Sequence, residues 1–233
     1  MKDPLASSPW SAPNTVAGFV QAPPNATLMR CAAAERERVG DGLIVDIGCG
    51  AGRNATPLAE SGWRIAGTDL SAPMLIAARD RAEAAGVPTR VVFVLAPMTT
   101  VPVRSRSADL VIAHGIWNLA RSSREFREGV LEAARVAKPG AALFVFTFSR
   151  NTLPIEAEPV AGETFVFTQF SGEPQCFLTE SQLLEEMGAA GFHLDAAVPL
   201  TEHNRRPPNA LPGARTGPVI YEALFRFSGV IPR

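Results

Sequence analysis

The segment LIVDIGCGAG, residues 43–52, decides the fold. It begins with an apolar run interrupted only by Asp46, which predicts a buried strand, and the glycines that follow predict a tight turn. Glycines at such a turn let backbone N–H groups approach a ligand that a Cβ atom would hold away. The segment therefore predicts a strand that ends at a loop binding the polar part of a nucleotide-like cofactor.

Asp69 ends the next predicted strand, about twenty residues beyond Gly48, where an acid can accept hydrogen bonds from both hydroxyls of a ribose. The dinucleotide-binding pattern G-x-G-x-x-G would place its third glycine at position 53. That residue is Arg53, and the third glycine is Gly52. The spacing indicates an adenosine-containing cofactor and weakens the interpretation as an NAD site.

Apolar runs alternate with helical patterns from residue 43 to residue 148. Regular alternation of this kind predicts right-handed crossovers and a doubly wound, mostly parallel α/β sheet with helices on both faces. The five prolines of residues 199–218 predict a loop, and residues 219–227 predict a last strand. We expect residues 25–233 to form a single domain.

Residues 1–24 are rich in Pro, Ala, Ser and Asn, a composition that opposes regular helix or strand. We expect an arm that is either a loose tail or a lid, with Trp10 and Phe19 docking on the body of the domain. The next segment, beginning at Asn25, has a helical pattern, and Asn25 is suited to cap it.

Charge and cysteine usage exclude several classes of function. The chain has 22 basic and 23 acidic residues, so no overall positive field attracts nucleic acid or anionic lipid. Three widely spaced cysteines fit neither a disulfide framework nor a metal site. The apolar run 141–148 is too short to cross a bilayer. We expect a cytoplasmic protein without metal, nucleic-acid or membrane partners, and the oligomeric state stays open.

Three motifs in order, DIGCGAG at 46–52, GTDLS at 67–71 and KPG at 138–140, resemble class I S-adenosylmethionine-dependent methyltransferases. The resemblance covers about residues 26–198. It implies a Rossmann-like fold with a seven-stranded, mostly parallel sheet and an antiparallel last strand. It also implies S-adenosyl-L-methionine as cofactor and a small molecule as methyl acceptor.

The resemblance implies that Asp46 orients the methionine end of the cofactor, that Asp69 holds the ribose and that Leu70 flanks the adenine. The family often has an acid after the third strand, whereas this chain reads LAPM at 95–98, so we expect Met98 to form one wall. The full set of expected cofactor-binding residues is Asp46, Gly48, Cys49, Gly50, Asp69, Leu70, Met98 and His114.

The segment after the fourth strand, residues 114–119, should face the transferable methyl group, because ligands of open sheets bind beyond the carboxyl ends of the strands. His114 is the candidate base, since an ordinary imidazole titrates near pH 6.5; alternatively it only contacts cofactor or backbone. Arg205, like the neighbouring Arg206, is suited to an anionic group of the acceptor. The expected acceptor-side residues are Trp10, Phe19, Trp117, Asn118, His203 and Arg205.

The GRN sequence at 52–54 is similar to the tellurite-resistance and thiol methyltransferase group, which favours a soft acceptor such as a thiol. An O- or N-methyltransferase of a natural-product pathway is the nearest alternative. Two further alternatives are an NAD-linked oxidoreductase on the same fold and a cofactor-binding module without catalysis.

Overall fold

A computed structural model describes residues 3–205 and 217–232, and its centre is one eight-stranded sheet in the order β3-β2-β1-β4-β5-β10-β8, with β9 also paired to β10. A separate pair of short strands, β6 and β7, lies beyond the sheet. The strands are β1 Leu43–Ile47, β2 Arg64–Asp69, β3 Val91–Leu95, β4 Ala108–His114, β5 Ala137–Phe148, β6 Val166–Phe167, β7 Gln175–Cys176, β8 Phe192–Leu194, β9 Thr201–His203 and β10 Ile220–Phe227.

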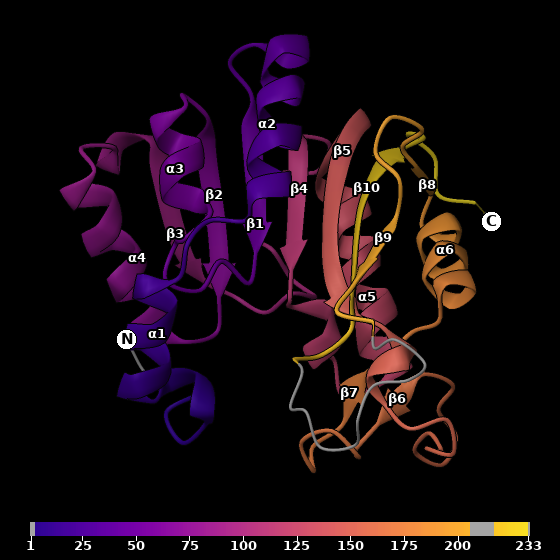
Figure 1. Cartoon of the computed structure of the whole chain (residues 1–233). Coiled ribbons are helices and arrows are strands. Elements are labelled where there is room, and N and C mark those ends of the chain that lie inside the picture. The colour runs from indigo at the N-terminus through magenta and orange to yellow at the C-terminus, as the bar shows by residue number, and fades with distance from the viewer. Residues whose placement is uncertain (1–2, 206–216, 233) are drawn as a thin grey trace.

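The strands β3, β2, β1, β4 and β5 run parallel, and β10 is antiparallel to β5, β8 and β9. The predicted doubly wound, mostly parallel α/β fold with an antiparallel last strand is thus confirmed. In Figure 1 the arrowheads of β1, β2 and β4 point toward the end of the sheet where α1 and the β6–β7 pair lie. The expected cofactor loop and His114 both lie at this end of the sheet, beyond the carboxyl ends of β1 and β4.

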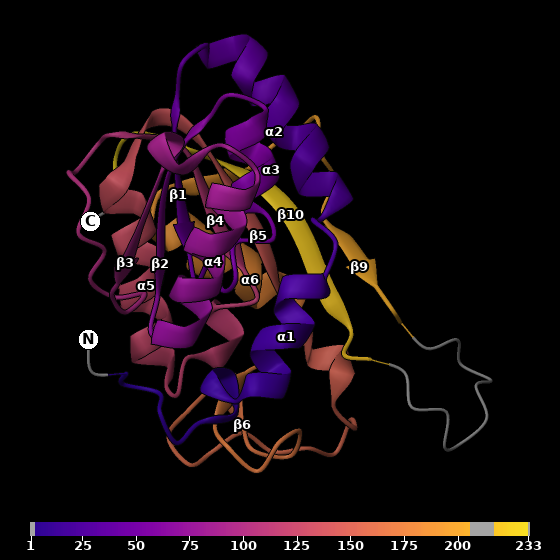
Figure 2. The ribbon, with the colours of Figure 1, turned by 90° about the vertical axis from the view of Figure 1, so that its left-hand side faces the viewer.

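Helices cover both faces of the sheet, as the alternation predicts (Figures 1 and 2). Residues of α2, α3 and α4 pack in one apolar cluster with the sheet, and residues of α5 and α6 pack in the other. The α-helices are α1 Pro13–Gln21, α2 Ala26–Val39, α3 Ala55–Glu60, α4 Ala72–Ala84, α5 Ser123–Val136 and α6 Glu180–Ala189. Single 3-10 turns are η1 Pro9–Ser11, η2 Pro88–Arg90, η3 Trp117–Leu119 and η4 Arg150–Thr152.

Polar side chains cap the starts of three helices, including the cap predicted at Asn25. The Asn25 side chain accepts a hydrogen bond from the Leu28 N–H at 2.8 Å. Thr179 and Gln182 form a complete capping box at the start of α6. The Ser122 hydroxyl caps α5 through the backbone N–H of Glu125. These caps satisfy N–H groups that have no partner inside the helix, so each fixes where its helix begins.

The N-terminal arm contains regular structure, although its composition indicates neither helix nor strand. Residues 13–21 form helix α1, which begins at Pro13, where proline costs no hydrogen bond, and packs against α4. Proline usually interrupts a helix, but at this first helical position its fixed φ angle favours helix formation. Part of the arm is therefore helical, and α1 lies at one end of the sheet (Figure 2).

Two further boundaries differ from the sequence interpretation. Strand β5 begins at Ala137 and includes the KPG residues, and the pairing of β4 with β5 shifts register between Ala108 and Leu110. A register shift of this kind accommodates Pro139 and Gly140, which a regular ladder would exclude. Residues 201–203, expected in a loop, form β9 at the edge of β10.

Within residues 3–205 and 217–232, none of the helices combines the length and the apolar composition that a membrane crossing requires.

Candidate active site

The loop after β1 has a backbone that only glycine adopts easily. Gly48, Gly50 and Gly52 have φ values of +73°, +54° and +71°. A Cβ atom on Gly48 would also lie 2.7 Å from the side chain of Ile116. The N–H groups of Gly48 and Cys49 donate to the Thr68 carbonyl at 2.7 and 2.9 Å, which fixes the loop against β2. The predicted glycine turn is therefore a rigid feature of the sheet edge.

Asp69 joins this loop to the end of β2. Its carboxylate accepts hydrogen bonds from the N–H groups of Gly50 at 2.9 Å and Ser71 at 2.8 Å. Burial raises the pKa of Asp69, and these backbone donors partly offset that effect. The two hydrogen bonds orient the carboxylate of Asp69 beside the loop, where the sequence predicts that it binds a ribose.

Asp46 is the buried carboxylate of the site. Its side chain is 1% exposed, and its Oδ2 atom has no hydrogen-bond partner within the described part of the chain. Burial, and then the charge of Asp69, raise the pKa of Asp46 to about 7. An isolated carboxylate in such a place is costly unless a cationic ligand or a hydrogen-bond donor reaches it. S-adenosylmethionine carries both a sulfonium and an ammonium group, and so fits this position.

Cys49 lies in the same loop but is a structural residue. The side chain is buried, and burial followed by the charges of Asp46 and Asp69 raises the pKa of its thiol. A thiol held protonated in this way is a poor nucleophile. We therefore assign Cys49 to packing beside the loop, where its N–H donates to Thr68 and its carbonyl accepts from Gly52.

His114 ends β4 inside a polar cluster. Its ring stacks on Phe146 at a centroid distance of 4.1 Å. Its Nδ1 atom lies 3.0 Å from Nη2 of Arg53, and its Nε2 atom lies 3.2 Å from Nδ2 of Asn25. Burial, and then the charge of Arg53, lower the pKa of His114 to about 3. The premise of an ordinary imidazole pKa is therefore wrong, and the ring is neutral at physiological pH.

Three members of this cluster were missed as functional candidates. Asn25 was read only as a helix cap, yet its Nδ2 atom also donates to Glu222 at 2.8 Å. Glu222 is buried in β10, and its Oε1 atom lies 3.5 Å from Nε2 of His203. Arg53 was read only as part of the GRN pattern. No local signal reveals this cluster, because its members come together only through the order of the strands.

The arm covers the glycine loop and the end of β2. The rings of Trp10 and Phe19 pack edge to face at 6.2 Å, and the Ser11 hydroxyl lies 2.9 Å from that of Ser71. A Cβ atom on Gly50 would lie 3.3 Å from Phe19. Trp10 and Phe19, expected on the acceptor side, therefore lie by the residues that would hold the methyl donor.

Replacement of Phe19 by alanine should open this cover. We expect S-adenosylhomocysteine to dissociate about tenfold faster from the Phe19→Ala protein, because the ring that shields the glycine loop is lost. Stopped-flow displacement measures the rate. Val20→Ala, which shortens an exposed neighbour, is the matched control and should leave the rate unchanged. Equal rates in all three proteins would show that the arm does not retain the ligand.

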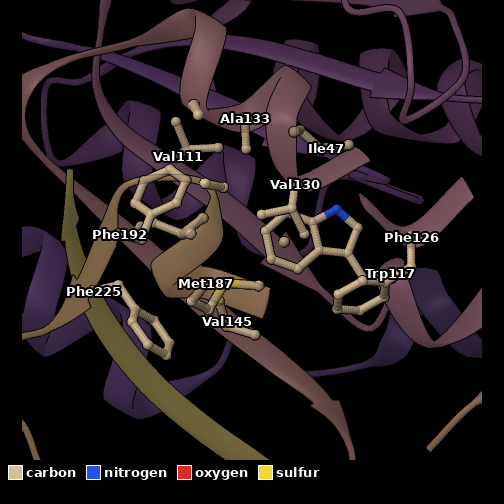
Figure 3. Packing of buried hydrophobic residues seen from close by; sticks show 14 of the residues in the cluster. Ile47, Val111, Trp117, Phe126, Val130, Ala133, Val145, Met187, Phe192 and Phe225 are labelled. Atoms are coloured by element: carbon tan, nitrogen blue, oxygen red, sulfur yellow. The ribbon is translucent and has the colours of Figure 1, made fainter. Parts of the chain in front are cut away.

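Other expected site residues lie elsewhere. Trp117, expected on the acceptor side, is fully buried and packs against Phe126 in the α5 side of the core (Figure 3). Met98 is buried in the same cluster. Asn118 is buried, with its Oδ1 atom unpaired among the described residues. It lies within η3, shortly after the carboxyl end of β4.

The C-terminal candidates separate from one another. His203 is half-exposed on β9 and faces Glu222, as described above. Arg205 is exposed and pairs with Glu202 at 3.4 Å, so its charge is already compensated. Glu202 also accepts hydrogen bonds from Ser149 and Asn151. Arg206 lies outside the described residues.

Comparison with known proteins agrees with this geometry. Residues 45–145 match the family model described as a methyltransferase domain. Its fold is similar to that of the CcbJ methyltransferase from Streptomyces caelestis, with a TM-score of 0.66, 17% identity and coverage of 91% of this chain and 96% of that one.

Two curated relatives are similar to part of this chain at higher sequence identity. A demethylmenaquinone methyltransferase of Corynebacterium efficiens is 33% identical over 48% of this chain and 44% of its own length. A ubiquinone biosynthesis O-methyltransferase of Methylobacterium sp. is 32% identical over 64% of this chain and 59% of its own length. The chain thus spans about half the length of these relatives.

Proposed function

We propose that this protein transfers a methyl group from S-adenosylmethionine to a small-molecule acceptor. The observation that carries the proposal is the pairing of two carboxylates across one glycine loop: Asp69, oriented by backbone donors, and Asp46, buried without a partner among the described residues. An adenosine with a cationic methionine end matches both. The match of residues 45–145 to a methyltransferase domain supports the same conclusion.

S-adenosylmethionine, when bound, supplies a methyl group on a positively charged sulfur that leaves as a neutral thioether. The protein then has to hold the acceptor in line with that methyl group and exclude water. Asp46 would balance positive charge at the methionine end, Asp69 would accept hydrogen bonds from the ribose, and Phe19 would cover the loop. Leu70, next to Asp69, would lie against the adenine.

The neutral state of His114 indicates what kind of acceptor the site takes. With a pKa of about 3, the imidazole is a weak base and draws little proton from an acceptor during attack. This favours an acceptor that arrives as a ready nucleophile, such as a thiol that is already partly ionised at neutral pH. An O-methyl acceptor with an acidic hydroxyl is the second candidate, favoured by the relative named for O-methylation in ubiquinone biosynthesis.

Labelled methyl donor offered with matched thiols, phenols and amines separates these candidates. We expect transfer to ionised thiols or acidic hydroxyls and no transfer to alkyl alcohols, which need a strong base. Transfer only to oxygen acceptors would contradict the proposal that the acceptor is a thiol. A tight donor complex that methylates none of the three classes would favour a binding module without catalysis.

Replacement of His114 tests its role directly. For a wild-type enzyme acting on an ionised acceptor, we expect the pH–rate profile between pH 5.5 and 8 to show no transition of an ordinary histidine, because burial and Arg53 keep the ring neutral. His114→Asn should keep that profile and lower kcat by about tenfold through lost packing on Phe146. A wild-type transition near pH 6.5 that disappears in the variant would instead identify His114 as a base.

A further inference from the structure

Arg53 is a half-buried cation, and the charge of the buried Asp46 opposes the effect of burial on its pKa. Its Nη2 atom contacts the imidazole of His114, and no ion pair within the described part of the chain includes it. Nε and Nη1 form no hydrogen bond to any described residue. Partial burial lowers the pKa of Arg53, which reflects the cost of holding this charge away from water. An anionic ligand would offset that cost.

Two side-chain donors face the ring of His114, and the cluster also contains an acceptor, Glu222, which accepts a hydrogen bond from Asn25. A neutral imidazole offers one acceptor nitrogen, yet Arg53 approaches His114 from one side and Asn25 from the other. Asn25 has its side-chain oxygen committed to capping α2, so its nitrogen is the atom facing the ring. Only one of the two contacts with the ring can be a hydrogen bond, and Nε and Nη1 of Arg53, which have no partner among the described residues, remain for a ligand that accepts.

The cluster begins beside Asp46, whose pKa the charge of Arg53 lowers, and reaches Glu222 on β10. Asp69 ends β2, whereas His114 ends β4 and is in register with Phe146 of β5, which in turn is in register with Glu222 of β10. Partners in register project from the same face of a sheet. The cluster therefore extends from the glycine loop toward β10, on the side opposite the ribose-holding acid.

We propose that Arg53 and His114 form an anion subsite for the methyl acceptor, and that the acceptor carries a carboxylate beside the atom that is methylated. This inference rests on the proposed methyltransferase function. The planar guanidinium group suits a carboxylate, which it binds through two parallel hydrogen bonds. The ring of His114 stacked on Phe146 gives a flat surface against which an aromatic or conjugated acid packs.

The test uses the protein saturated with S-adenosylhomocysteine and pairs of probes that differ only in charge: 4-hydroxybenzoate with 4-hydroxybenzamide, and 2-mercaptobenzoate with its amide. We expect each acid to bind wild-type protein about tenfold more tightly than its amide in calorimetric titration. Arg53→Gln should reduce that preference to less than about twofold and leave the affinity for S-adenosylhomocysteine within about threefold. Arg53→Lys, which keeps charge without the planar fork, should retain an intermediate preference.

Arg64→Gln removes an exposed arginine at the start of β2 and is the control that should keep the full preference. Equal binding of acids and amides by the wild-type complex, or no binding of either acid, would overturn the inference. A larger loss of S-adenosylhomocysteine affinity in Arg53→Gln would overturn it too, because Arg53 would then hold the carboxylate of the donor. Failure of wild-type protein to bind S-adenosylhomocysteine would instead contradict the proposed function itself.

Discussion

Asp46→Asn is expected to stabilise the ligand-free protein increasingly as pH rises from about 4 to 7. The pKa of Asp46 is about 7 in the folded protein against an ordinary value of 3.8, so the unfolded chain loses this proton first. Folding stability therefore falls with rising pH across that interval, by about 4 kcal/mol at most. Asparagine has no such ionisation. In thermal unfolding, the melting temperature of the variant minus that of the wild type should be about 10 °C larger at pH 8 than at pH 4.5.

The same carboxyl group should release a proton when the methyl donor binds. A cationic ligand favours the ionised form, so calorimetry at pH 6.5 in buffers of different ionisation enthalpy should detect up to about one proton released. Asp46→Asn should abolish this release and weaken donor binding. A stability difference that stays constant from pH 4.5 to pH 8 would contradict the assignment of Asp46 as a carboxyl group that ionises with its ligand.

Asp69→Asn should weaken binding of S-adenosylhomocysteine by about 100-fold. The loss combines two charge-assisted contacts to a ribose with the weaker hold of an amide on the N–H groups of Gly50 and Ser71. Asp109→Asn is the matched control, because Asp109 also accepts a backbone N–H, from Leu43, and pairs with Lys138. That control should lower the melting temperature without a change in ligand affinity. Equal affinity of wild-type and Asp69→Asn proteins would remove Asp69 from the cofactor site.

The cofactor side could be read from sequence because its determinants are local. A buried strand, a glycine turn and an acid at the end of the next strand are close along the chain, and each has a distinct residue signature. The structure gives those same residues positive φ angles at Gly48 and Gly50 and an oriented carboxylate at Asp69. The structure also shows that Oδ2 of Asp46 is buried without a partner among the described residues, which the sequence motif alone does not reveal.

The acceptor side could not be read in the same way. Asn25, His114 and Glu222 are far apart in sequence and come together because β10 inserts beside β5. Trp117 follows β4 like a site residue, but the turn η3 directs its ring into the core. The arm was read from its composition, and the favourable position of Pro13 at the start of α1 depends on the register of a helix that composition does not reveal.

Calorimetric titration with S-adenosylmethionine, repeated with NAD, tests the central claim most directly. The claim is that the glycine loop, with Asp46 and Asp69 on either side, holds the methyl donor. We expect one S-adenosylmethionine bound per chain, more tightly at pH 8 than at pH 6, and no heat of binding with NAD. Binding of NAD without binding of S-adenosylmethionine would contradict the claim and identify the site as one for a dinucleotide.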